Sequence, residues 1–333
     1  ADPGLDFLLI AFLTWAEDYL LLPFLRRLPP NLPVGYWCYA HHATGPGGDS
    51  VPELLRNSGP VGTFEGAAVV TGWNRRWEVF LGKPEEPDLR RDLAAWTRAA
   101  RVRAGLERLT IGLLPYRNDQ MMVTFVDEFR LRRDLGPEVR YLSVRELASH
   151  VQAVPEAEAR AWAKALTRRH PRRDVSDAAL ASAARASLGL ARLVAKEKLE
   201  VLALNDICPE LHAVLGQRPC LYADDLVERE TVVGLEGDVG CATAMWILHA
   251  LGGGPAMFAE PYNWNVARNS AVFGHAGPQN PAMAGGARRI TLTPDYEYRA
   301  VDPTAGAWME FCAGPGRVTL LNLICAPNGF QMI

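Results

Sequence analysis

Short apolar runs alternate with helical patterns along most of the chain, and this alternation is the feature that most constrains the fold. Residues 109–116 (LTIGLLPY) and 199–206 (LEVLALND) each have the pattern of a buried strand, and two helices are expected between them, over 156–169 and 178–198. A continuous apolar run is typical of a strand that is buried on both faces of a parallel sheet. The order therefore predicts α/β domains, with Rossmann-like parallel sheets covered by helices on both faces.

Changes in composition divide the chain into three predicted segments. The chain opens almost directly on an apolar run and ends on GFQMI, which is typical of a strand interior, so we expect an incomplete first α/β domain over 1–107. A second Rossmann-like α/β domain is predicted over 108–230. Beyond it, Gly and Pro become frequent and short β-like runs appear, among them RRITLT and RVTLLNLI. Residues 231–333 are therefore expected to form a β-rich C-terminal domain, barrel-like or a sandwich, that carries part of the functional site.

Composition excludes several classes of protein. The formal net charge of the 333 residues is −3, so no basic surface indicates binding to nucleic acid or to an anionic membrane. The six cysteines are scattered without a C-x-x-C pair, which argues against a zinc ribbon or a disulfide framework and favours the cytoplasm. The early run DFLLIAFLTW is too short to span a bilayer.

Acidic side chains follow two of the predicted strands. Glu236 and Asp238 end the strand TVVGL and precede an apolar helix, and Glu210 follows the strand that ends in ND. Ligands of open parallel sheets bind beyond the carboxyl ends of the strands, and residues two apart on a strand point the same way. Downstream, His275 lies in the tight turn FGHAG. Carboxylates with one imidazole suit Mn²⁺ or Mg²⁺ better than structural zinc.

Each of these residues also has an ordinary structural explanation. Asp238 is a favoured N-cap for a helix that starts near Val239, a role that leaves one carboxylate oxygen free. Glu210 is suited to cap a turn, and His275 to be a turn histidine. Glu236 is equally suited to be a solvated residue or a neighbour that supports the metal ligands.

A polar and aromatic segment precedes His275. Asn263, Trp264 and Asn265 combine amides with an indole, which together can stack on a sugar ring and bond its hydroxyls, although a structural loop fits the segment equally well. Arg117, at the start of the second predicted domain, is a further candidate for substrate binding.

The stretches NDICPEL, EGDVGCATAMWIL and FGHAG, in this order, resemble the L-fucose isomerase and L-arabinose isomerase superfamily. The stretches NSGPVGTFEGAAVV, IGLLPYRNDQMMVTFVDEF and GAWMEFCAGPGRVTLLNLI resemble further segments of the family, so the resemblance spans most of the chain. It departs from the family at Ala276, where the family has Cys, and in the turn 119–122. The resemblance implies a metal-dependent aldose–ketose isomerase that acts on a sugar through a cis-enediol, and a homo-oligomer of three or six chains.

The resemblance also implies roles for single residues. Glu210 would be a metal ligand that also transfers protons, Asp238 the second ligand and the other acid/base group, and His275 the metal-binding histidine. Glu236 would support them, or would replace Asp238 as the second ligand, since branches of the family differ over which acid binds. The departures motivate an alternative, a sugar-binding or regulatory protein that retains the fold without catalysis. A nicotinamide dehydrogenase would also fit the α/β order, but the chain lacks a dinucleotide fingerprint.

Overall fold

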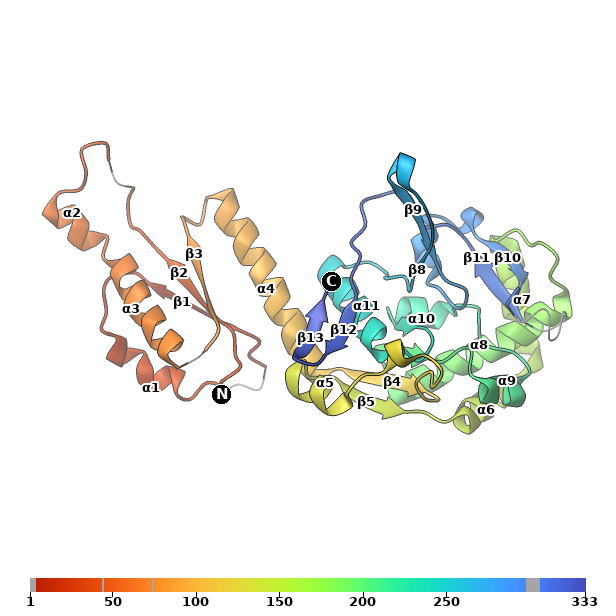
Figure 1. Ribbon diagram of the computed structural model, residues 1–333. Coiled ribbons are helices and arrows are strands. Elements are labelled where there is room, and N and C mark those ends of the chain that lie inside the picture. Colours follow the sequence, from red (N-terminus) through yellow and green to blue (C-terminus); the bar gives the residue numbers. More distant parts are fainter. Residues whose placement is uncertain (1–3, 44, 74, 298–305) are drawn as a thin grey trace. The chain divides into compact units, whose positions relative to one another are not determined.

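The computed structural model describes residues 4–43, 45–73, 75–297 and 306–333 (Figure 1). The chain separates into two compact units, residues 1–105 and 106–333, where the sequence predicted three segments. Each unit has its own sheets and is described by itself.

The first unit is built on a three-stranded parallel sheet in the order β1-β2-β3. Its strands are β1 (Leu8–Phe12), β2 (Val34–Cys38) and β3 (Trp77–Leu81). Successive residues of β2 face opposite sides: Tyr36 bonds the Gly66 carbonyl in α3 (Gly59–Gly72), whereas Gly35 lies against Trp96 in α4 (Pro87–Arg108). Helices therefore cover both faces, as predicted. The unit also contains η1 (Asp18–Leu20), α1 (Leu22–Leu25) and α2 (Val51–Arg56).

The second unit contains a four-stranded sheet in the order β5-β4-β6-β7, and every pair in it is parallel. Its strands are β4 (Thr110–Leu114), β5 (Glu138–Tyr141), β6 (Val201–Leu204) and β7 (Val232–Gly234). All four residues of β6 are fully buried, which explains its uninterrupted apolar sequence. The prediction of a parallel α/β sheet is confirmed. The sheet also continues past the expected boundary at residue 230, because β7 is its edge strand.

Seven helices are described in this unit, and they include both helices predicted between β4 and β6. They are α5 (Glu128–Asp134), α6 (Val144–Gln152), α7 (Glu156–Arg169), α8 (Asp177–Glu197), α9 (Pro209–Leu215), α10 (Asp224–Glu228) and α11 (Val239–Gly252). Among the described helices, α8 alone is long and apolar enough to cross a membrane, and 61% of its most apolar window is buried inside the protein. It packs against α6 and α7, as a core helix does.

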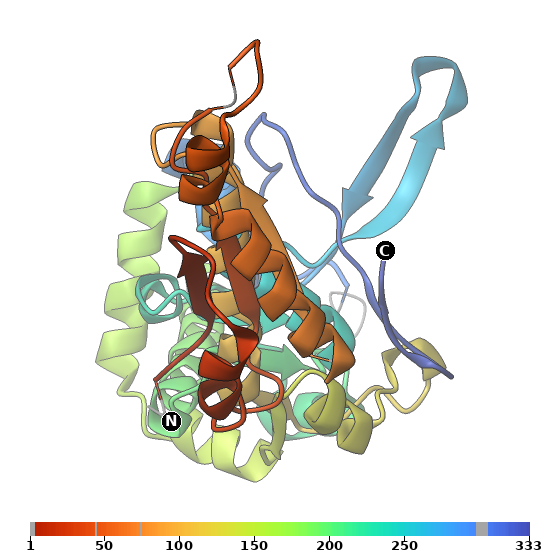
Figure 2. The same cartoon turned by 90° about the vertical axis from the view of Figure 1, so that its left-hand side faces the viewer.

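The expected barrel-like C-terminal domain is not confirmed. The described part of this region forms three separate two-stranded antiparallel sheets. They pair β8 (Glu260–Asn265) with β9 (Ser270–Gly274), β10 (Thr291–Pro294) with β11 (Ala307–Glu310), and β12 (Leu323–Ala326) with β13 (Gly329–Met332). The β8–β9 hairpin projects from the unit with most of its side chains exposed, so none of the described sheets packs on it to close a barrel (Figures 1 and 2). In RVTLLNLI, strand structure begins only at Leu323.

Short 3₁₀ helices complete the described elements of the second unit. They are η2 (Met122–Thr124), η3 (Val266–Arg268), η4 (Pro281–Ala284) and η5 (Ala287–Arg289).

Candidate functional site

The segments that follow β4, β6 and β7 meet at the carboxyl edge of the second sheet. Gly237, beyond β7, donates its N–H to the carbonyl of Leu204 at the end of β6, at 3.0 Å. A Cβ on Gly237 would lie 2.8 Å from the Tyr116 carbonyl oxygen and 3.0 Å from the Arg117 Cα, so only glycine allows the segment after β4 to approach this closely. The edge is where parallel sheets bind ligands, as the sequence analysis expected.

A tight turn separates the side chains of Glu236 and Asp238. β7 ends at Gly234, and Glu236 and Gly237 both adopt left-handed backbone conformations, with φ of 58° and 65°. The strand therefore does not persist to these two residues, and the rule that residues two apart on a strand point the same way does not apply to them. Asp238 caps α11 instead, since its Oδ1 accepts the Cys241 N–H at 2.8 Å. This N-cap role was expected as an ordinary structural explanation of Asp238, and it does not exclude a ligand role.

Glu236, Glu260 and His275 form a cluster at this edge. His275 Nε2 lies 3.4 Å from Glu236 Oε1 and 3.8 Å from Glu260 Oε2. The antiparallel register of the hairpin pairs Glu260 with Gly274, which places His275 next to Glu260. The side chains of His275 and Glu236 are 6% and 12% exposed, whereas that of Glu260 is 45% exposed. The cluster is thus closed on one side and open to solvent on the other.

The imidazole of His275 is held in one tautomer. Its Nδ1 lies 2.6 Å from the Ala276 carbonyl oxygen, which can only accept, so Nδ1 carries the hydrogen and Nε2 faces the two carboxylates. The Phe258 ring packs edge-on against the imidazole, with 4.8 Å between the centroids. Burial lowers the pKa of His275, but the hydrogen bond that the protonated ring donates from Nε2 to Glu236, together with the nearby carboxylates, raises it, and the net effect is a raised pKa.

Asp238 is a carboxyl group with strongly altered acidity. Burial raises the pKa of Asp238 to about 6, although the backbone N–H groups of Cys241 and Gly240 lower it. The neighbouring charge of Glu236 raises the pKa further. A carboxyl group with such a pKa can exchange protons near neutral pH.

The cluster fits a hard divalent cation. Among the described residues, Glu236, Glu260 and His275 are the group whose ligand atoms all lie within 4.8 Å of one another. Ligands about 2.1 Å from a six-coordinate ion lie roughly 3.0 Å apart when adjacent and about 4.2 Å apart when opposite. The distances from His275 Nε2 fall within this range, and Nε2 is the nitrogen left free to bind. Small side-chain movements would bring all three atoms onto one ion.

The predicted metal ligands are only partly brought together. His275 is in the cluster, and Glu236, expected to support the ligands, contacts it directly. Glu210 is exposed in the first turn of α9, and Asp238 is engaged at the α11 N-terminus, so their ligand roles remain predictions. Sequence reasoning missed Glu260. The signal that could have found it is the hairpin pattern of EPYNWN and SAVFG, because a hairpin brings Glu260, at the start of its first strand, close to the end of its second strand, next to His275.

The predicted substrate-binding residues lie on the hairpin and beside the Gly237 turn. Trp264 is 69% exposed, and the carboxamide oxygens of Asn263 and Asn265 accept backbone N–H groups of Trp264 and Arg268. These amides therefore hold the local loop. The Arg117 guanidinium lies 3.4 Å from the centroid of the Phe125 ring.

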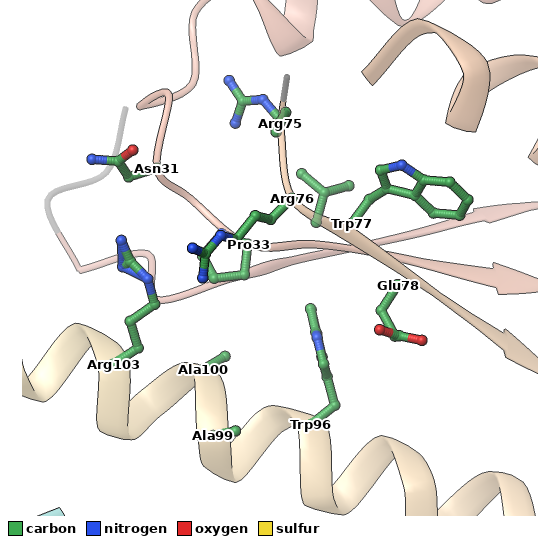
Figure 3. A pocket seen from close by; sticks show the side chains of 11 residues that line it. Asn31, Pro33, Arg75, Arg76, Trp77, Glu78, Trp96, Ala99, Ala100 and Arg103 are labelled. Atoms are coloured by element: carbon green, nitrogen blue, oxygen red, sulfur yellow. The ribbon is translucent and has the colours of Figure 1, made fainter. Parts of the chain in front are cut away.

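The first unit contains cavities of its own. One, of about 500 Å³, lies between α4 and the starts of β2 and β3, where Arg76, Arg103 and Trp96 line it (Figure 3). The amino ends of parallel strands are not their usual ligand edge. A larger cavity of about 810 Å³ is lined by Trp15, His42 and other residues that follow β1 and β2. Neither cavity includes a residue of the Glu236 cluster.

Curated relatives of the chain are sugar isomerases. Sulfoquinovose isomerase of Priestia aryabhattai is 23% identical over 99% of this chain and 71% of its own length. L-arabinose isomerase of Thermotoga neapolitana is 27% identical over 77% of this chain and 52% of its own length. No protein-family model matches the chain. The relatives confirm the resemblance to isomerases of the fucose/arabinose type that the motifs indicated.

Proposed function

We propose that this protein, whose relatives are sugar isomerases of the fucose/arabinose type, is a metal-dependent aldose–ketose isomerase. The observation that carries the proposal is the cluster of Glu236, Glu260 and His275 at the carboxyl edge of a parallel sheet. Its donor set suits Mn²⁺ or Mg²⁺. In this proposal the ligand role passes from Glu210 and Asp238 to Glu236 and Glu260, because these two carboxylates face His275.

The two carboxylates of the cluster are suited to different tasks. Glu236 is almost enclosed, and its Oε1 lies 3.4 Å from His275 Nε2. Glu260 is half exposed at the base of the hairpin, on the side from which a sugar would enter. A bound divalent cation would polarise the sugar carbonyl and offset the negative charge that develops on its oxygen.

The reaction requires a proton to move between two neighbouring carbons. A carboxylate takes the proton from C2 of the open-chain aldose while O1 gains a proton, which gives a cis-enediol. The O2 hydroxyl then loses its proton and the carboxyl group returns its proton to C1. We assign the carbon proton transfer to Glu260, because its carboxylate is accessible to substrate, with an expected contribution of about 10²–10⁴-fold. Asp238 retains a proposed role in proton exchange at the oxygens.

Solvent exchange tests the proposal. Mn²⁺-loaded protein is incubated in D₂O with a panel of aldoses and ketoses that includes a sulfonated hexose, and deuterium at C1 and C2 is followed by NMR. We expect exchange with at least one sugar, and loss of exchange with chelator and in Glu260→Gln. The matched control is Glu228→Gln, an exposed glutamate on α10 outside the cluster. Sugar binding without exchange, in the presence of metal, would instead support the non-catalytic alternative.

A further inference from the structure

A buried network of charges lies directly behind the Glu236 turn. Arg218 is fully buried, and its guanidinium binds Asp295 through two hydrogen bonds of 2.7 and 2.9 Å. Its Nη1 donates to Asp206 Oδ2 at 2.7 Å, and its Nη2 lies 2.6 Å from a Glu297 carboxylate oxygen. Asp206 and Asp295 are 0% and 2% exposed. Such a network costs desolvation, so it is weak support for a purely stabilising role.

Asp206 connects this network to the backbone of Glu236. Its Oδ2 accepts from Arg218, and its Oδ1 accepts the N–H of Glu236 at 3.1 Å. Glu236 has the left-handed φ of 58°, an uncommon conformation for a residue with a side chain. The bond from Asp206 favours this conformation, which turns the Glu236 carboxylate toward His275.

Asp206 also contacts the segment that carries His275. A Cβ on Gly277, two residues after His275, would lie 3.0 Å from Asp206 Oδ2 and 2.9 Å from the Leu235 side chain. The turn after His275 therefore rests on Asp206 and on the residue that precedes Glu236. One buried carboxylate thus touches both segments that supply the enclosed side of the cluster.

We propose that Asp206, oriented by Arg218, is a positioning residue that holds the backbone of Glu236 so that its carboxylate faces His275. Asp206 does not touch the substrate or the ion; it acts through Glu236. This inference rests on the proposed function only for the purpose of the cluster, which is to bind the metal. The fixed backbone of Glu236 is a property of the protein itself and can be measured without metal or sugar.

Two isosteric substitutions in the same network separate positioning from general stability. Asp206→Asn replaces one carboxylate oxygen by an N–H₂ group, so either Arg218 or the Glu236 N–H faces a donor instead of an acceptor. Asp295→Asn likewise replaces a carboxylate oxygen that accepts from Arg218 by an N–H₂ group. Asp295 itself has no bond to Glu236, so it serves as the control. Three quantities are measured in both variants: the thermal midpoint, Mn²⁺ affinity by titration followed by electron paramagnetic resonance, and hydrogen exchange of the Glu236 amide in metal-free protein.

In Asp206→Asn we expect the remaining carbonyl oxygen to stay with the charged Arg218, because a hydrogen bond from a charged donor is the stronger of the two. The Glu236 N–H then loses its acceptor, and its amide exchange should rise about tenfold or more. Mn²⁺ affinity should fall about 10–100-fold, as when other residues that orient a metal ligand are changed. In Asp295→Asn the amide exchange of Glu236 and the Mn²⁺ affinity should both stay within about threefold of wild type. This should hold even if the thermal midpoint falls as much as it does in Asp206→Asn.

Unchanged exchange of the Glu236 amide in Asp206→Asn would overturn the proposal. An equal loss of Mn²⁺ affinity in Asp206→Asn and Asp295→Asn would also overturn it, because the loss would then follow from lower stability and not from the bond to Glu236. Wild-type protein that neither binds Mn²⁺ nor isomerises any sugar would refute the proposed function, and the amide-exchange comparison would still decide the positioning role. Should Asp206→Asn fail to fold, Arg218→Lys keeps the charge but not the two-pronged geometry, and the same exchange measurement applies.

Discussion

Burial changes the acidity of a histidine that contacts Asp206. The His212 side chain on α9 is half-buried, and its Nε2 lies 3.3 Å from the Asp206 carbonyl oxygen. Burial lowers the pKa of His212, the bond to this carbonyl raises it, and the charge of Arg218 lowers it; the net effect is a lowered pKa. His212 is therefore neutral in the folded protein at pH values where the unfolded chain is already protonated.

This lowered pKa predicts a pH-dependent loss of stability. The unfolded chain binds more protons than the folded protein once the pH falls below about 6.5, so the contribution of neutral His212 to stability is complete above that pH and is lost as the pH falls toward the folded pKa. We expect the urea midpoint of wild type to fall more steeply than that of His212→Gln between about pH 7.5 and pH 5.5. Parallel curves for the two proteins would contradict the prediction. His150→Gln, on α6 of the same unit, controls for the loss of an imidazole.

At the residue scale, sequence reasoning identified the chemistry of the site better than its geometry. The carboxyl edge and His275 follow from strand order and residue type, which are visible in the sequence. Two backbone features could not be predicted from the sequence: the left-handed turn at Glu236 and the pairing of Glu260 with Gly274. Both depend on contacts between segments distant in sequence, because Glu236 is held by Asp206 and Glu260 is placed by its partner strand.

Among the elements, α8 shows how local signals and packing act together. Ser176 is the N-cap of α8, and its hydroxyl accepts the Ala179 N–H at 3.1 Å. The buried face of the helix packs on α6 and α7. The cap satisfies a backbone donor that has no partner inside the helix.

Removal of this cap should weaken the second unit. Ser176→Ala is expected to lower the free energy of unfolding by about 1 kcal/mol, measured by urea denaturation. The control is Ser149→Ala on α6, where an exposed hydroxyl bonds a carbonyl within its own helix. Alanine is favoured in a helix interior, so this change should cost little. Equal losses in the two variants would show that the cap bond contributes nothing of its own.

Elements with strong periodicity were predictable, and the late β region was not. The helix 156–169 and the buried strands β4 and β6 follow from patterns contained within each segment. A closed barrel needs pairing between strands that are far apart in the sequence. Nothing within RRITLT or RVTLLNLI specifies the strand with which each run pairs. In the structure these runs lie in two-stranded antiparallel sheets or outside strands, and YEYRAV lies largely outside the described residues.

On the scale of the whole molecule, the division into two units assigns the proposed metal to one of them. Glu236, Glu260 and His275 all belong to residues 106–333, and each unit has its own sheet and buried side chains. A ligand that binds only the folded form stabilises the unit that binds it, by an amount set by its concentration relative to Kd. Metal should therefore act selectively in thermal unfolding.

We expect two transitions in calorimetric unfolding, one for each unit, and we expect Mn²⁺ to raise the midpoint temperature of one of them. At a free Mn²⁺ concentration of about 100 times Kd the stabilisation is about 2.7 kcal/mol, which corresponds to roughly 5–10 °C for a unit of this size. Two core variants assign the transitions: Val34→Ala should lower that of the first unit, and Leu202→Ala that of the second, because both side chains are fully buried. Mn²⁺ should raise the transition that Leu202→Ala lowers, and Glu236→Gln should abolish most of the shift. A shift in the transition lowered by Val34→Ala, or a full shift in Glu236→Gln, would place the metal elsewhere.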